Sequence, residues 1–193
     1  MIHEIVTASR TVRSFDETKP VSCETLEKLI DTARLSPSAK NAQPLRYILI
    51  NEKETVETLV SMTKYAAALP ELHLPPVGHH PTAFIAVLTD TEVSAVNGRF
   101  TMFDAGLSCQ SLMLRAHEEG LGGVILASFE AERVKTVLDI GERYEPLVLI
   151  ALGVPDEEVR LCEVGDDGKT EYYRDENDVH FVPKRKLGDV IIK

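Results

Sequence analysis

Hydrophobic and polar positions along the chain follow two patterns, helical spacing and short continuous apolar runs. Apolar residues that recur three and four apart predict helices, at residues 2–9, 22–35, 53–69, 97–119 and 131–138. Apolar runs of strand length predict strands, at residues 46–51, 83–88, 124–127 and 146–152. Because helices alternate with buried strands, we expect an α/β fold in which a central sheet lies between helices in a three-layer sandwich.

Three of these segments have a more specific pattern. The run at 83–88 is continuously apolar, which indicates a strand covered on both faces. The apolar residues of 97–119 spread around the helix instead of forming one stripe, which predicts a buried helix. Residues 70–82 are rich in proline and histidine, so we expect a surface loop there.

The C-terminal arm, about 156–193, departs from this alternation. Residues 156–178 are strongly charged, and strand-like alternation returns at 179–182 before an apolar end at Val190, Ile191 and Ile192. An extended arm has too little sequence around it to bury these side chains. We therefore expect the arm to pack against a neighbouring subunit, as part of a single domain that covers residues 1–193.

Composition and charge narrow the possible partners. A chain of 193 residues with 44% hydrophobic content can form one full core. The net charge of -10 disfavours nucleic acid and anionic membrane surfaces. No apolar run approaches the roughly 18 to 20 residues of a membrane span, and the start of the chain lacks the pattern of a signal peptide. Cys23, Cys109 and Cys162 have no metal-like spacing and suggest reduced thiols, so we expect a cytoplasmic protein.

The segment 35–44, between a predicted helix and a predicted strand, is a candidate binding loop. Its short polar side chains and backbone amides are suited to holding a planar, polar ligand. An ordinary helix stop at Pro37, with local turn bonds from Ser38 and Asn41, is equally compatible with the loop alone. We expect Gln43 to brace the loop.

Two groups of basic residues are candidates for binding phosphate. Arg10 and Arg13 flank Thr11 just after the first helix, and guanidinium is a planar, permanently charged donor that suits phosphate. The alternative is a pair of solvated surface arginines. The run 184–186 is a dense basic cluster in an acidic chain, although such a run is more often simply solvated.

Taken together, these motifs resemble the flavin-dependent nitroreductase family. The pattern R-x-x-R-x-F begins at Arg10, and S-P-S-x-x-N-x-Q-P begins at Ser36 before a strand. Further matching motifs lie at 103–106, 120–123, 151–155 and 182–187, so that the resemblance spans almost the whole chain. One departure is Leu45, where many members have Trp, which we interpret as a packing difference. We interpret the glycines at 120–123 as a helix C-cap and turn, since they precede a strand and lack G-x-G-x-x-G.

The resemblance implies a homodimer with FMN bound non-covalently at the interface and the C-terminal arm swapped between subunits. It further implies transfer of hydride from NAD(P)H through the flavin to a nitroaromatic, quinone or flavin acceptor by a ping-pong cycle. Because the cofactor carries the reaction, no catalytic side chain is expected. Two alternatives are a specialised flavoenzyme of the same fold, of the dehalogenase or flavin-fragmenting type, and a flavin-binding protein without turnover. The first usually carries an inserted lid over the flavin. The segments where a lid could be inserted, 69–81 and 89–100, are short in this chain.

By position, the resemblance also implies roles for individual residues. Those expected at the flavin phosphate are Ser9, Arg10, Thr11 and either Lys184 or Arg185, with Arg13 near the pyrimidine edge. Those expected at the pyrimidine end, from the partner subunit, are Pro37, Ser38, Ala39 and Asn41. Backbone amides of Leu126, Ala127 and Ser128 are expected near the flavin N5.

Two further groups have no role in this scheme. His73, His79 and His80 lack acidic or cysteine partners at ligand spacing, so we predict no metal site. Asp104 lies on a helix predicted to be buried, where an unpaired carboxylate is costly. We therefore expect it to cap a neighbouring element or to pair with an arginine.

Overall fold

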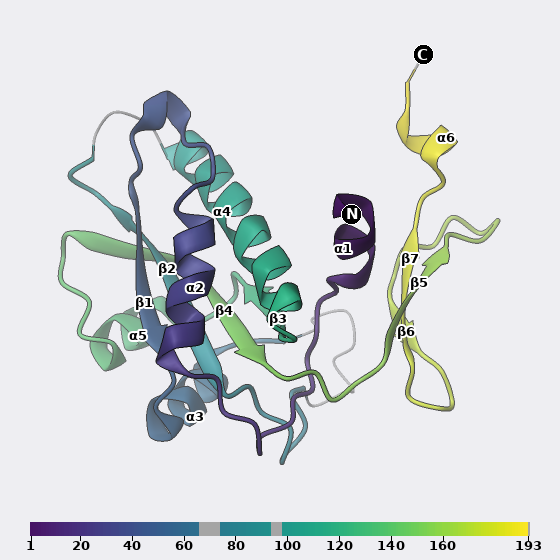
Figure 1. Ribbon diagram of the computed structural model, residues 1–193, viewed down its shortest axis with the longest axis horizontal. Helices are drawn as coiled ribbons and strands as arrows, with labels where there is room; N and C mark the ends of the chain where they lie inside the picture. Colours follow the sequence, from purple (N-terminus) through teal and green to yellow (C-terminus); the bar gives the residue numbers. More distant parts are fainter. Residues whose placement is uncertain (66–73, 94–97, 193) are drawn as a thin grey trace.

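A four-stranded antiparallel sheet lies at the centre of the computed structural model, which describes residues 1–65, 74–93 and 98–192 (Figure 1). Its strands, in spatial order, are β1 (Leu45–Ile50), β2 (Ala83–Asp90), β4 (Tyr144–Gly153) and β3 (Gly122–Leu126). The register places Ile85 of β2 opposite Leu49 of β1 on one side and Ile150 of β4 on the other. All three pairings are antiparallel, so the predicted α/β sandwich belongs to the α+β class.

Helices cover both faces of this sheet, which confirms the predicted three layers. On one face are α2 (Cys23–Ala33) and α4 (Gly98–Glu118), and on the other are α3 (Lys53–Met62) and α5 (Ala131–Val137). The strand β2 shows why two cores form, because Ile85 and Val87 point to the first face, while Phe84 and Ala86 point to the second. This strand is buried on both faces, as its apolar run predicted.

The helix α4 differs from its sequence-based prediction. Its inner face is buried, but Met102, Phe103 and Leu107 are exposed by 51%, 57% and 49%. The helix lies in the outer layer, so these side chains face away from the sheet. The prediction that this helix is buried all round was therefore wrong for the outer face of α4 in the single chain.

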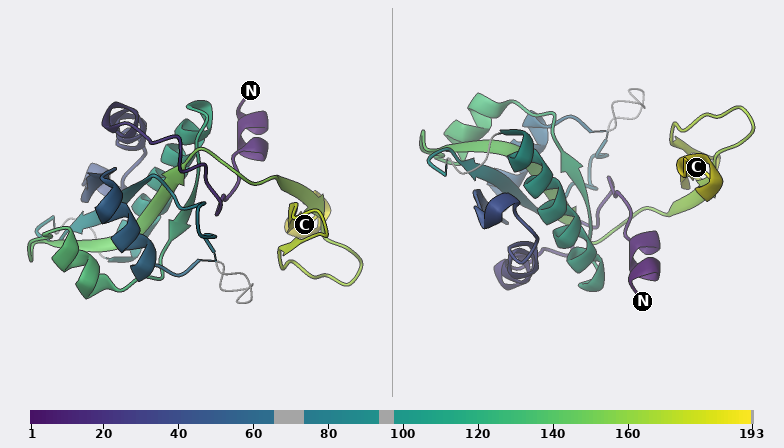
Figure 2. Two further views of the ribbon diagram at one scale, coloured as in Figure 1. Left: turned by 90° about the horizontal axis from the view of Figure 1, so that it is seen from below. Right: turned by 90° about the horizontal axis from the view of Figure 1, so that it is seen from above.

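The C-terminal arm forms a small sheet of its own. Its strands β5 (Val159–Glu163), β7 (His180–Lys184) and β6 (Tyr173–Arg174) lie in that spatial order and are followed by α6 (Leu187–Val190). Figure 2 shows this sheet standing apart from the body of the molecule. The charged segment 156–178 thus contains two strands that were not predicted. Near the end of the arm, Ile192 is 97% exposed. No helix within the described ranges is long and apolar enough to cross a membrane.

Candidate functional site

The N-terminal candidate segment runs along the edge strand of the main sheet. After α1 (Ile2–Ala8), Thr11 pairs in parallel with Gly123, and the Val12 N–H donates to the Gly123 carbonyl at 2.9 Å. A Cβ on Gly122 would lie only 2.7 Å from Cγ2 of Val12, so the close approach requires glycine at that position. The sequence motif that contains Arg10 is thereby fixed against β3.

The same edge carries the other predicted backbone site. Leu126 ends β3 and is buried, and Ala127 and Ser128 follow it as exposed residues. From Gly123 to Leu126 the strand rises roughly 10 Å. The structure thus brings the N-terminal segment and residues 126–128 onto one edge of the sheet. At the start of β3, Gly120 has φ +75° and caps α4, as predicted for this glycine-rich turn.

The two arginines of the N-terminal segment are partly withdrawn from solvent. Arg10 donates from Nη2 to the Val6 carbonyl at the end of α1, while Nε is buried and has no hydrogen-bond partner within the described ranges. The Arg13 guanidinium lies 4.8 Å from the centre of the Tyr172 ring, and its Nε is likewise without a partner there. Burial lowers the pKa of both groups; for Arg13, the nearby Tyr172 and Glu157 oppose this effect.

Charge pairing separates these arginines from most others in the chain. The arginines that form ion pairs with carboxylates are Arg34, Arg46, Arg115, Arg133, Arg143, Arg160 and Arg174. Arg10, Arg13, Lys184 and Arg185 form none with any residue that the structure describes. In a chain of net charge -10, cations left without carboxylates can compensate an anionic ligand.

The second candidate segment, the loop between α2 and β1, is fixed to α4 by Asp104. Asp104 is 4% exposed, and its carboxylate accepts hydrogen bonds from Ser38 Oγ at 2.6 Å and from the Ala39 N–H at 3.0 Å. It therefore caps the short 3-10 helix η1 (Ala39–Asn41), which confirms the expectation that Asp104 caps a neighbouring element. The Gln43 side chain donates to the Asn41 carbonyl at 3.2 Å, so Gln43 braces the loop as predicted.

The two candidate segments lie on opposite sides of α4. Ser9 Oγ donates to the Met113 carbonyl at 3.3 Å, whereas Ser38 binds Asp104. Nine residues separate these two positions on α4, equivalent to about 2.5 turns, half a turn around the axis and roughly 13 Å along it. Figures 1 and 2 show α1 and α2 on either side of α4. One chain therefore does not bring Ser9 and the loop together.

Comparison with known proteins identifies the family. The family model described as "Nitroreductase family" matches residues 6–154, which is more than half of the chain. The chain belongs to the nitroreductase family. It is therefore an enzyme of an oxidoreductase family.

Individual relatives agree with this assignment. A protein of Methanothermobacter thermautotrophicus, named "Putative NADH dehydrogenase/NAD(P)H nitroreductase", is 27% identical over 158 residues, which cover 80% of this chain and 77% of that protein. A putative nitroreductase of Desulfovibrio desulfuricans, solved in complex with FMN, matches with a TM-score of 0.73 at 20% identity, over 100% of this chain and 95% of that one. An FMN-dependent nitroreductase of Clostridium difficile R20291 matches with a TM-score of 0.67 at 22% identity, over 83% and 90%. At these identities the two structures show the nitroreductase fold alone.

The nitroreductase-family body meets its C-terminal arm at a buried ionic cluster that the sequence reasoning missed. Glu157 accepts a hydrogen bond from the Arg13 N–H, pairs with Arg174 and lies 3.7 Å from His180 Nδ1. Burial raises the pKa of Glu157, but contacts with His180, the Arg13 N–H and Arg174 outweigh burial and lower it below its usual value. No spacing in the charged segment 156–178 distinguishes Glu157 from its neighbours, so the sequence offered no signal for this cluster.

The arm also carries the basic residues predicted at the flavin phosphate. Lys184 ends β7 and is exposed, as is Arg185. Since the arm stands apart from the body (Figure 2), their convergence with Arg10 stays a prediction.

Two histidines of the 70–82 loop, His79 and His80, lie near carboxylates. His79 Nδ1 lies 2.7 Å from Asp156, and His80 Nδ1 lies 3.9 Å from Glu17. His73 lies outside the described residues. Within the described ranges, no group of three or more potential ligands could hold a metal ion.

Proposed function

We propose that the chain is an FMN-dependent oxidoreductase that transfers hydride from NAD(P)H to a small oxidant, such as a nitroaromatic, a quinone or a free flavin. The two substrates use the same site in turn, as a ping-pong cycle requires. The observation that supports this most directly is the pair Arg10 and Arg13, held along the edge of β3, neither of which forms an ion pair with a carboxylate that the structure describes. The FMN and NAD(P)H named for relatives supply the identity of cofactor and donor.

The residues present fit a cofactor with a phosphate and a planar ring. The buried Nε donors of Arg10 and Arg13 have no partner within the described ranges and can bind an anion. We assign Ser9, Arg10 and Thr11 to the phosphate, together with Lys184 or Arg185. Bound FMN supplies the hydride chemistry.

Other residues of the chain orient the ring. A positive charge on Arg13 beside the pyrimidine edge favours electron uptake by the ring. Leu126 is buried at the end of β3 and is followed by the exposed Ala127 and Ser128, and the N–H groups of these residues can donate to the reacting edge. Pro37, Ala39 and Asn41 approach the pyrimidine end from the partner subunit, and Asn41 offers both a donor and an acceptor.

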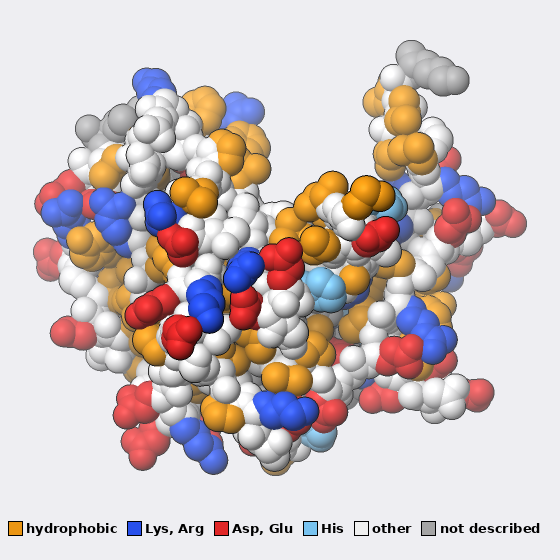
Figure 3. Space-filling model, in the orientation of Figure 1, with side chains coloured by type: hydrophobic (Ala, Val, Ile, Leu, Met, Phe, Trp, Pro, Cys, Tyr) orange, Lys and Arg blue, Asp and Glu red, His pale blue; other side chains and the backbone are white. Residues whose placement is uncertain are grey.

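A homodimer with FMN at its interface is part of the proposal. The chain exposes 11327 Å² of surface, whereas a compact monomer of its mass exposes about 9,100 Å². Figure 3 shows a notch between body and arm, with hydrophobic side chains over α1 and on the tail. The separation of the two candidate segments by α4 also supports a site completed by a second chain, with the arm swapped between subunits.

The proposal places the protein in the cytoplasm. Cys23, Cys109 and Cys162 are all free thiols, which is consistent with a reducing compartment.

Anaerobic addition of NADPH to the purified yellow protein tests the proposed function. We expect bleaching of the visible flavin absorbance, and its return when a quinone or nitroaromatic is added. Acid release should yield one FMN per chain. An absorbance that neither NADPH nor NADH bleaches would indicate a flavin-binding protein without turnover, and release of FAD would contradict the assigned cofactor.

A further inference from the structure

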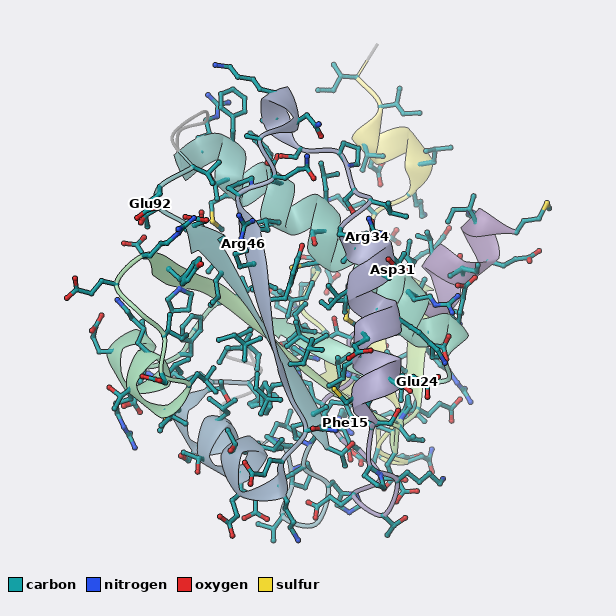
Figure 4. The ribbon with its side chains drawn as sticks, turned by 60° about the vertical axis from the view of Figure 1, so that its left-hand side comes forward. Phe15, Glu24, Asp31, Arg34, Arg46 and Glu92 are labelled. Carbon is teal, nitrogen blue, oxygen red and sulfur yellow. The ribbon has the colours of Figure 1, made fainter. Side chains whose placement is uncertain are left out.

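The loop between α2 and β1 is held at its C-terminal end by a buried aspartate of β2. The Asp90 N–H donates to the Pro44 carbonyl at 2.8 Å, and the Asp90 side chain is 0% exposed. Its carboxylate binds Arg46 Nη2 at 3.2 Å, while Arg46 Nη1 donates to the Gln43 carbonyl at 3.0 Å. Figure 4 shows Arg46 on β1 and Arg34 just after the end of α2, the two elements that the loop joins.

The N-terminal end of the loop is held by Asp104 through Ser38. The Ser38 hydroxyl donates to the Asp104 carboxylate at 2.6 Å and accepts from the Gln43 N–H at 2.9 Å. A serine hydroxyl has a single proton to donate. In this arrangement that proton is committed to Asp104, so Ser38 cannot also donate to a ligand.

The backbone between these two ends is conformationally costly. Lys40, Asn41 and Gln43 have φ values of 54°, 55° and 50°, a left-handed region that asparagine tolerates and that is costly for Lys40 and Gln43. Beside the loop lies a cavity of about 220 Å³, lined in part by Pro37, Ser38 and Asp104. Lys40, Asn41 and Gln43 are also exposed, so hydrogen bonds contribute more to the shape of the loop than apolar packing does.

We propose that Asp104 and Ser38 are positioning residues, which fix the loop so that Asn41 presents its amide to the flavin ring. Ser38 thus acts through the loop and does not contact the ring, in contrast to its expected role as a cofactor-binding residue. This inference rests on the proposed function, because it assumes that a flavin binds at the loop.

Flavin affinity tests the inference with a readout other than activity. The Kd for FMN is measured by dilution of the holoprotein, and the Kd for riboflavin by competition with FMN. Ser38→Ala and Asp104→Asn should each weaken both flavins equally, by about tenfold for one lost hydrogen bond. Ser38→Thr keeps the hydroxyl and suits the extended backbone at this residue, with φ -129° and ψ 141°, so its affinity should match the parent.

Ser36→Ala is the matched control. It removes a hydroxyl two residues away that donates to Ser111 at 2.8 Å and takes no part in the hydrogen bond between Ser38 and Asp104, so neither Kd should change. If Asp104→Asn lowers the thermal midpoint so far that the protein unfolds, the comparison of Ser38→Ala with Ser38→Thr decides. Equal weakening of flavin binding by Ser38→Ala and Ser38→Thr would overturn the positioning role of the Ser38 hydroxyl.

A double-mutant cycle with Asn41→Ala separates positioning from direct contact. If Asp104 acts by positioning Asn41, adding Asp104→Asn to Asn41→Ala causes no further loss of affinity. A full additional loss would overturn the inference. If the parent protein binds no flavin, the proposed function itself is refuted. If Ser38→Ala and Asp104→Asn bind flavin with the same Kd as Ser36→Ala, only the positioning role is refuted.

Discussion

Glu157 links the arm to the N-terminal candidate segment through one buried carboxylate. Its side chain is 2% exposed, and it joins the Arg13 backbone to Arg174 and His180 of the arm. Because these contacts hold the pKa of Glu157 below the ordinary value for a glutamate, they stabilise the folded state only while the carboxylate is ionised. The stabilisation is complete above the unfolded pKa, about 4.3, and is lost as the pH falls through the lower folded pKa.

We therefore expect Glu157→Gln to lower the free energy of unfolding at neutral pH and to matter less in acid. Removing one partner of a buried ion pair costs about 3 kcal/mol or more. Urea unfolding at pH 7 and near pH 3.5, at one protein concentration, measures the difference between parent and variant. Glu158→Gln, at an exposed pair with Arg160, is the control and should change little at either pH. A Glu157→Gln difference that is equal at both pH values would show that the carboxylate charge is not responsible.

Among the secondary structure elements, β3 has the most direct influence on the proposed cofactor site. As the edge strand of the main sheet, it pairs with the segment after α1 and ends at the exposed backbone of residues 127–128. Gly122 makes this possible, because Cγ2 of Val12 and Cγ of Pro155 occupy the space that a Cβ would need. Val12 is β-branched and cannot easily rotate away.

Gly122→Ala should displace the N-terminal segment from β3. Crowding at a packed contact of this kind costs about 1–3 kcal/mol, and the shift of Arg10 should weaken FMN more than riboflavin, which lacks the phosphate. Gly141→Ala is the matched control, since a Cβ there meets nothing within 4 Å. Thermal unfolding and the two flavin Kd values measure both effects. An unchanged ratio of the two Kd values would contradict the proposed link between β3 and the phosphate.

Elements that are determined by local capping or by burial within this chain could be predicted from the sequence. Ser22 caps α2 by accepting from the Thr25 N–H at 3.1 Å, and the run at 83–88 is a central strand, as expected. The strands β5 and β6 could not be recognised, because their charged residues obscure the alternation. The exposed face of α4 was misread because an apolar helix surface has the same pattern whether its own chain or a second chain covers it.

The candidate site was predictable to a similar degree. The motifs located Arg10 and the 35–44 loop, and the cost of burying a carboxylate pointed to the capping role of Asp104. The hydrogen bond from the Ser38 hydroxyl to Asp104 could not be predicted, since it depends on how α4 packs against the loop in three dimensions. Glu157 had no signal at all, because its partners lie on the later part of the arm and on the segment after α1.

At the scale of the whole molecule, one exposed face of α4 is consistent with the proposed homodimer. On α4, Gly106 lies on the same exposed face as Phe103 and Leu107. Glycine within a helix is unfavourable relative to alanine, but it permits close approach of another backbone. Together with the apolar residues Ile191 and Ile192 at the end of the arm, this face has the properties expected where two chains of this protein meet.

The position of α4 between the two candidate segments has a consequence for subunit complementation. If each flavin is bound by Arg10 of one chain and Asn41 of the other, a mixed dimer of an Arg10→Ala chain and an Asn41→Ala chain contains one doubly defective site and one intact site. Arg10→Ala alone should weaken FMN about 10- to 150-fold at every site. The mixed dimer, co-expressed and isolated through two affinity tags, should therefore bind half of its FMN with the parental Kd. If each chain built its own site, every site in the mixed dimer would carry one defect, and no parental phase would appear in the titration.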